Sequence, residues 1–98
     1  MFEIVLMPEA VEDLRRFHAN ARSALREALE VHLRHEPTKT SRSRIKRLRD
    51  VASPQYRLRV DEIRVFYDVV GERVEVLAIV AKSEAASWLA RFGKTDPE

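Results

Sequence analysis

Three arginines in the stretch "QYRLRVDEIRVFYDV", residues 55–69, are the side chains of this sequence best suited to chemistry. A guanidinium group binds phosphate through two parallel hydrogen bonds and stays charged near neutral pH. Arg57 and Arg59 are two residues apart, so in a β-strand they point to the same face. Arg64 follows a tight turn and can join them from the next strand. The spacing therefore predicts a phosphate-binding face on a β-hairpin.

The charge of the chain is distributed unevenly. Residues 39–64 hold nine basic and three acidic residues, a net charge of +6, whereas the remaining residues carry a net charge of −4. This asymmetry favours a surface that faces a polyanion. A solvated basic loop without a partner is the alternative interpretation. The polyanion interpretation is preferred because the basic pattern continues from the loop into the strands.

Arginines suit one part of a ribonuclease reaction. RNA is cleaved when its own 2′-hydroxyl attacks the adjacent phosphate, which requires an oriented attack, a stabilised phosphorane and a protonated 5′-oxygen. Loss of one charge-stabilising donor costs about 3–4 kcal/mol in comparable oxyanion sites. Arginines are poor general bases, however, and no histidine pairs with a carboxylate in the basic segment. The sequence therefore does not predict a self-contained ribonuclease of the His–Glu kind.

Two other sets of residues invite a functional interpretation. His32 and His35 are three residues apart on a predicted helix, but no third metal ligand is apparent. We therefore expect surface histidines, no metal site and no cofactor. Trp88, the only tryptophan, could stack on a nucleic-acid base. A packing role on a terminal amphipathic helix is the preferred interpretation.

Composition excludes several classes of protein. The chain has 98 residues and no cysteine, so it contains no disulfide framework and no thiolate chemistry. No apolar run reaches the roughly 20 residues of a membrane span. The N-terminal "MFEIVLMPEAVEDL" lacks the basic region of a signal peptide. We expect one domain over residues 1–98, located in the cytoplasm and not at a membrane.

The first third of the chain predicts a strand followed by a helical hairpin. Residues 2–6 alternate as in a β-strand, and Pro8 suits the first turn of a helix. A second helix is expected over residues 21–34, with Asn20 as its N-cap. Pro37 ends this helix.

The remainder of the chain predicts a basic connection, a meander and a final helix. Residues 38–50 form a loop or short strand held by Ile45 and Leu48. Ser83 is expected to cap the last helix. Three strands joined by short turns follow the connection, over residues 55–60, 63–69 and 73–81. The predicted class is α+β, with a helical hairpin packed on a small, mainly antiparallel β-sheet and a short C-terminal helix.

This order of elements resembles the RelE/ParE superfamily, the toxins of type II toxin–antitoxin systems. The resemblance spans nearly the whole chain, and its most specific segment is "YRLRVDEIRVFYDVVGERVEVLAI". Ribosome-dependent members of the RelE branch enter the ribosomal A site and cut the bound messenger. The resemblance implies a messenger endoribonuclease that inhibits translation and arrests growth. The alternatives are a ParE-like inhibitor of DNA gyrase and a weakened nucleic-acid-binding relic.

The resemblance also implies a set of catalytic positions. Arg57 and Arg59 match two basic residues of the family's first meander strand, and Arg64 matches an arginine of the next strand. Lys82 lies near a family arginine, and Trp88 lies where a C-terminal tyrosine is expected, so both positions depart from the family pattern. We expect a surface arginine such as Arg64 to be removable for no more than about 0.5 kcal/mol. The implied catalytic residues are Arg57, Arg59, Arg64 and Lys82.

The implied partners are an antitoxin protein, the ribosome and messenger RNA, with DNA gyrase in the alternative. The basic connection is expected to bind RNA through Arg42, Arg44, Lys46, Arg47 and Arg49. Exposed ion pairs contribute only about 0–1 kcal/mol each, so an apolar contact must supply most of the antitoxin affinity. We expect that contact at the last helix, which ends the chain and is predicted to be loosely held when free. The expected antitoxin-binding residues are Trp88, Leu89 and Phe92.

Overall fold

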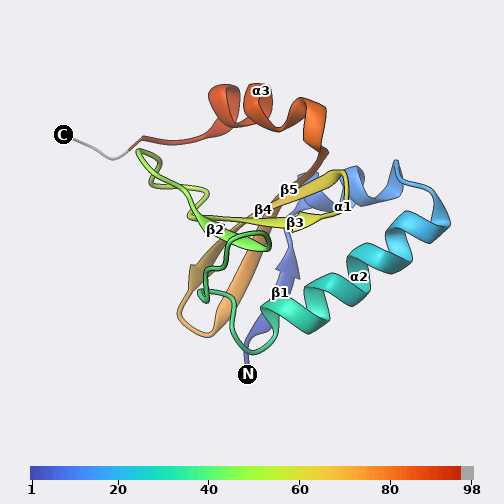
Figure 1. The fold of residues 1–98 in the computed structure, drawn as a ribbon, viewed down its shortest axis with the longest axis horizontal. Coiled ribbons are helices and arrows are strands. Elements are labelled where there is room, and N and C mark those ends of the chain that lie inside the picture. The colour runs from blue at the N-terminus through green and yellow to red at the C-terminus, as the bar shows by residue number, and fades with distance from the viewer. Residues whose placement is uncertain (96–98) are drawn as a thin grey trace.

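The computed structural model describes residues 1–95 and contains one five-stranded sheet with helices on both faces (Figure 1). Its strand order is β1-β5-β4-β3-β2, with β1 parallel to β5 and the other pairs antiparallel. The elements in chain order are β1 (Glu3–Leu6), α1 (Pro8–Arg15), α2 (Ala19–Leu33), β2 (Ile45–Arg47), β3 (Tyr56–Val60), β4 (Ile63–Val70), β5 (Arg73–Ala81) and α3 (Lys82–Phe92). This is the α+β class that the sequence predicts.

The helical hairpin of α1 and α2 covers one face of the sheet and forms the main core. α1 buries Ala10 and Leu14, four residues apart, and α2 buries a stripe of leucines with the same spacing. The sheet side of this core comes from alternate residues of β3, β4 and β5, among them Leu58 and Val65. Within residues 1–95 no helix is long and apolar enough to cross a membrane.

Several predicted boundaries differ from those observed. α2 begins at Ala19, with His18 at the N-cap position, so Asn20 lies inside the first turn. Neither this helix nor α3 has a side-chain cap: the N-cap residues are His18 and Ala81, and neither side chain accepts a hydrogen bond from the first turn. Ser83 is therefore the second residue of α3 and not its cap. The basic connection contains the short strand β2, which pairs with β3. The predicted single domain spans residues 1–98, of which residues 96–98 lie outside the part of the chain that the structure describes.

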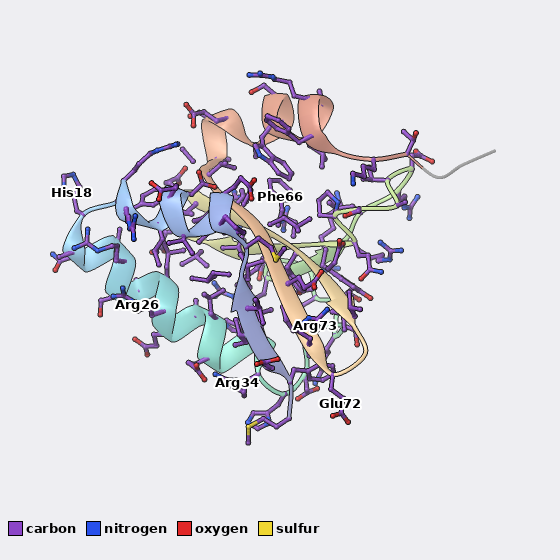
Figure 2. All side chains as sticks on the ribbon, turned by 180° about the vertical axis from the view of Figure 1, so that it is seen from behind. His18, Arg26, Arg34, Phe66, Glu72 and Arg73 are labelled. Carbon is purple, nitrogen blue, oxygen red and sulfur yellow. The ribbon has the colours of Figure 1, made fainter. Side chains whose placement is uncertain are left out.

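α3 covers part of the opposite sheet face and is held at both ends. The Lys82 amide donates a hydrogen bond of 2.8 Å to the Glu62 carbonyl where the helix begins. After the helix, the Lys94 amide donates to the Ser53 carbonyl at 2.7 Å. Between these ends the Trp88 ring stacks on Phe66, with ring centroids 4.8 Å apart. Figure 2 shows Phe66 beneath α3. The expectation that few contacts hold this helix is therefore wrong. Its mobility in the free protein stays a prediction.

Tyr67 connects the centre of the sheet to the segment that follows α2. Its side chain is fully buried, and its hydroxyl donates a hydrogen bond of 2.6 Å to the Pro37 carbonyl. Burial raises the pKa of Tyr67, and the adjacent Tyr56, whose ring stacks on it, adds to the effect. Ionisation of the buried phenol is therefore disfavoured in the folded chain.

Tyr67→Phe is expected to lower the free energy of unfolding by about 1–3 kcal/mol at neutral pH, because the buried Pro37 carbonyl loses its partner. The raised pKa adds a pH dependence. Above pH about 10 the unfolded chain ionises Tyr67 while the folded chain keeps it neutral. This part of the stability is complete below that pH and is lost as pH rises. Urea unfolding should show that the difference in free energy of unfolding between wild type and Tyr67→Phe becomes smaller as pH rises above about 10.

Tyr56→Phe is the matched control. The Tyr56 hydroxyl makes no hydrogen bond within residues 1–95, so its removal should change stability by less than about 0.5 kcal/mol. Equal losses in the two variants would contradict the role assigned to the Tyr67–Pro37 hydrogen bond.

Candidate nucleic-acid interface

One face of the sheet, opposite the helical hairpin, gathers four basic residues from three neighbouring strands. Arg59 of β3 lies directly opposite Arg64 of β4. Arg57 lies opposite Lys46 of β2, on the same face of β3 as Arg59. We name Lys46, Arg57, Arg59 and Arg64 the basic sheet face. Strand alternation and the tight Asp61 turn thus place the three arginines together, as their spacing predicts.

Arg64 is buried at this face, with 7% of its surface exposed. One terminal nitrogen donates hydrogen bonds of 2.8 Å to the Asp61 carbonyl and 3.0 Å to the Ile63 carbonyl. Asp61 has a positive φ of 51°, so Arg64 stabilises a turn with an uncommon backbone conformation. The expectation that Arg64 is a surface residue is therefore wrong, whereas the cost of its removal stays a prediction.

Arg57 carries an unsatisfied donor. Its Nε atom is buried and has no hydrogen-bond partner among residues 1–95. Burial lowers the pKa of the Arg57 guanidinium, and the positive charges of Arg64 and Arg59 lower it further. A buried donor without a partner costs about 1–3 kcal/mol. An anion placed here would satisfy the donor and reduce the repulsion among the three arginines.

Two further predicted residues lie beside the basic sheet face. The Arg44 side chain donates a hydrogen bond of 2.9 Å to the Arg59 carbonyl, and the Arg59 amide donates to the Arg44 carbonyl. Lys82 is exposed at the first turn of α3, and its amide binds the carbonyl of Glu62 in the β3–β4 turn. Both residues therefore lie at the end of the sheet that carries Arg59 and Arg64.

The other predicted RNA-binding residues do not lie on the basic sheet face; they are Arg42, Arg47 and Arg49. Arg47 shares the helix side of β2 with the buried Ile45, and its guanidinium lies 5.3 Å from the centre of the Tyr56 ring. It also donates a hydrogen bond of 2.8 Å to the Gln55 carbonyl. Arg42 and Arg49 are exposed in the connections on either side of β2. Arg47 is thus directed away from the basic sheet face.

A polar network that the sequence interpretation missed fixes the connection between β2 and β3. The Asp68 carboxylate accepts hydrogen bonds from the Ser53 hydroxyl at 2.5 Å and the Gln55 amide at 2.7 Å. The Gln55 side chain in turn accepts a hydrogen bond of 2.8 Å from the Val69 amide. The sign of this network in the sequence was Asp68, an acidic residue on the same face of its strand as Arg64. The network positions the segment that carries Arg49.

The basic sheet face consists of guanidinium and ammonium groups, which can bind phosphate and stabilise negative charge. His32 lies on α2, where burial lowers its pKa and the Arg44 charge adds to the effect. His35 lies beyond the end of α2. Residues 1–95 contain no group of three or more His, Cys, Asp or Glu side chains that could hold a metal ion.

Solved structures with this arrangement of elements define the class of fold. The archaeal RelE–RelB complex from Pyrococcus horikoshii OT3 has a chain that matches with a TM-score of 0.68 and 18% identity, covering 83% of this protein and 94% of that chain. The RelBE2 complex from Mycobacterium tuberculosis matches with a TM-score of 0.68 and 19% identity, covering 82% and 96%.

The YoeB–YefM complex from Staphylococcus aureus matches with a TM-score of 0.65 and 18% identity, covering 82% of this protein and 95% of that chain. The protein therefore has the RelE-like fold, as the sequence resemblance implies. No protein-family model matches the chain, and no curated protein matches it. At these identities the likeness establishes the fold, and activity must be argued from the site.

Arg57→Met is expected to leave the free energy of unfolding unchanged or to raise it by up to about 3 kcal/mol. The substitution keeps an apolar stem while it removes a buried unpaired donor and a repelled charge. Urea unfolding measures the change.

Arg26→Met is the control for this variant, because Arg26 is exposed on α2, away from the sheet (Figure 2). It should change stability by no more than about 0.5 kcal/mol. A loss greater than about 1 kcal/mol in Arg57→Met, with no loss in the control, would mean that Arg57 serves the fold and not a ligand.

Proposed function

We propose that this protein is the toxin of a type II toxin–antitoxin pair and that it cleaves messenger RNA on the ribosome. The observation that carries the proposal is the basic sheet face, with the unpaired buried donor of Arg57, on a RelE-like fold. The similar structures are complexes of a toxin with an antitoxin, which supports an antitoxin as the partner of this chain.

In this proposal the arginines have different roles at the scissile phosphate. Arg57 and Arg59 hold its oxygens, since one has a free donor and the other is exposed beside it. Arg64, fixed by the turn carbonyls, adds a positioned charge that stabilises the phosphorane. Lys82 approaches from the end of the sheet. The remaining basic residues of the connection contact neighbouring phosphates, except Arg47, which is directed away from the basic sheet face.

In this proposal the ribosome orients the reacting groups of the messenger, because the basic sheet face has no side chain suited to proton transfer. Arginine does not titrate near neutral pH, so it neither accepts the 2′-hydroxyl proton nor donates one to the leaving 5′-oxygen efficiently. A messenger held on the ribosome has its 2′-hydroxyl and phosphate already oriented, which lowers the demand on the protein. The proposal therefore includes ribosome and messenger RNA as partners, without a metal or cofactor, and a cytoplasmic location.

A second candidate function is inhibition of DNA gyrase in the manner of ParE. It is favoured by Trp88, which stands where the RelE branch is expected to have a tyrosine and which packs on Phe66. A gyrase inhibitor requires a binding surface but no proton transfer. A nucleic-acid-binding relic without either activity is the third candidate.

Induced expression followed by mapping of RNA 5′ ends tests the proposal. We expect growth arrest with new 5′ ends inside coding sequences. Arg59→Ala should lower the cleavage rate by about 10²–10³-fold, because it removes one charge-stabilising donor. Arg59 is the preferred position because its side chain is exposed, whereas Arg64 stabilises a turn.

Arg26→Ala is the matched control and should cleave like wild type. Growth arrest with unchanged RNA ends, together with loss of supercoiling by purified gyrase, would contradict the ribonuclease and support the second candidate. An absence of arrest with retained, salt-sensitive RNA binding would support the relic.

A further inference from the structure

The main chain of Arg59 is held by a single residue of the basic connection. The Arg59 amide donates a hydrogen bond of 2.9 Å to the Arg44 carbonyl, and the Arg44 guanidinium donates one of 2.9 Å to the Arg59 carbonyl. β2 begins only at Ile45, which pairs with Leu58. The contact between Arg44 and Arg59 therefore extends the sheet one residue beyond the paired strands, with a side chain as one of the two donors.

The neighbouring strand β4 does not bind these groups of Arg59. In an antiparallel pair the amide and the carbonyl of one residue point to the same side. Since both groups of Arg59 are bound to Arg44, Arg59 and Arg64 form a non-hydrogen-bonded pair, whose Cα atoms are only about 4.5 Å apart. Like charges that face each other in this way repel. Arg44 therefore holds the main chain from which a repelled, exposed guanidinium extends.

Arg44 is itself fixed by the turn that precedes β2. The Ser41 hydroxyl accepts hydrogen bonds from the Arg44 amide at 3.0 Å and from the Ile45 amide at 3.4 Å. The Ser41 amide donates to the Ile45 carbonyl at 2.9 Å. These bonds involve only the main chain of Arg44. Replacing the Arg44 side chain therefore removes its hydrogen bond to Arg59 without removing the turn.

Arg44 can act on RNA in two ways, which an experiment must separate. Its side chain lines a hollow of about 280 Å³ together with Ser43, Arg59 and Asp61, so it can also contact a phosphate itself. Arg42 is exposed two residues earlier in the same connection but makes no hydrogen bond to Arg59 within residues 1–95. Arg42 therefore reports the effect of a basic residue in this connection that acts only by its own charge.

We propose that Arg44 is a positioning residue for Arg59. Its side-chain hydrogen bond to the Arg59 carbonyl fixes the main chain from which the Arg59 guanidinium reaches the phosphate of the RNA. A guanidinium whose origin is fixed loses less freedom when it binds an anion, so the face is better preorganised. This inference rests on the proposed function, because it takes Arg59 to be a phosphate-binding residue.

A double-mutant cycle on RNA affinity tests the inference. The affinity of the full chain for a labelled single-stranded RNA is measured by fluorescence anisotropy at one salt concentration. In the wild-type background, Arg44→Gln should weaken binding about 3- to 10-fold more than Arg42→Gln does, because it also displaces Arg59. In the Arg59→Ala background the two substitutions should weaken binding equally, within about twofold.

Urea unfolding of the same variants separates positioning from stability. The hydrogen bond from Arg44 ends on a main-chain carbonyl, so it does not need the Arg59 side chain. Arg44→Gln should therefore lower the urea midpoint by the same amount with and without Arg59→Ala. A role in stability alone would make its effect on RNA affinity equal in the two backgrounds as well. Arg44→Lys, which keeps the charge, enters the cycle if circular dichroism shows that Arg44→Gln is not folded.

Two results would overturn the inference alone. One is an equal effect of Arg44→Gln and Arg42→Gln in the wild-type background. The other is an excess loss in Arg44→Gln that persists in Arg59→Ala, which would make Arg44 a direct phosphate contact only. If Arg59→Ala binds RNA as tightly as wild type does, this inference and the proposed role of the basic sheet face fail together. The two kinds of failure are therefore distinguishable.

Discussion

Repulsion among three guanidinium groups is the constraint on which the rest of this structure depends. The β3–β4 register sets Arg59 against Arg64 and holds Arg57 on the same face, with its Nε buried and without a partner among residues 1–95. An isolated hairpin would relieve this crowding by fraying, since two strands alone are marginally stable in water. The arrangement persists because other parts of the fold hold both strands in place.

Three contacts supply that support. The apolar core under the hairpin, with Tyr67 bound to the Pro37 carbonyl, fixes the strands from below. Arg64 is held by the carbonyls of its own turn, so its charge cannot swing away. α3 packs Trp88 on Phe66, directly beside Arg57 in the register, and is anchored at both ends. Together they keep a charged face preorganised for an anion.

Local patterns in the sequence were sufficient to predict the elements and the faces of the arginines. Alternation places Arg57 and Arg59 together, and a two-residue turn fixes the register that adds Arg64. The pattern did not reveal that Arg64 is buried, because its partners are backbone carbonyls. The direction of Arg47 was also missed, since it depends on the phase of β2, which Ile45 sets by packing in the core. The anchoring of α3 involves Ser53 and Lys94, far apart in the chain and without a side-chain signal.

The salt dependence of RNA binding tests the central claim, that the basic sheet face binds the phosphate backbone, most directly. The affinity for a labelled single-stranded RNA should be measured by fluorescence anisotropy over a range of salt concentrations. The slope of log K against log salt should fall in magnitude by about 0.7 for each phosphate that the protein no longer neutralises, in Arg59→Ala and again in Arg57→Met/Arg59→Ala. Arg26→Ala should keep the wild-type slope. An unchanged slope in the double variant, with the fold intact, would contradict the account.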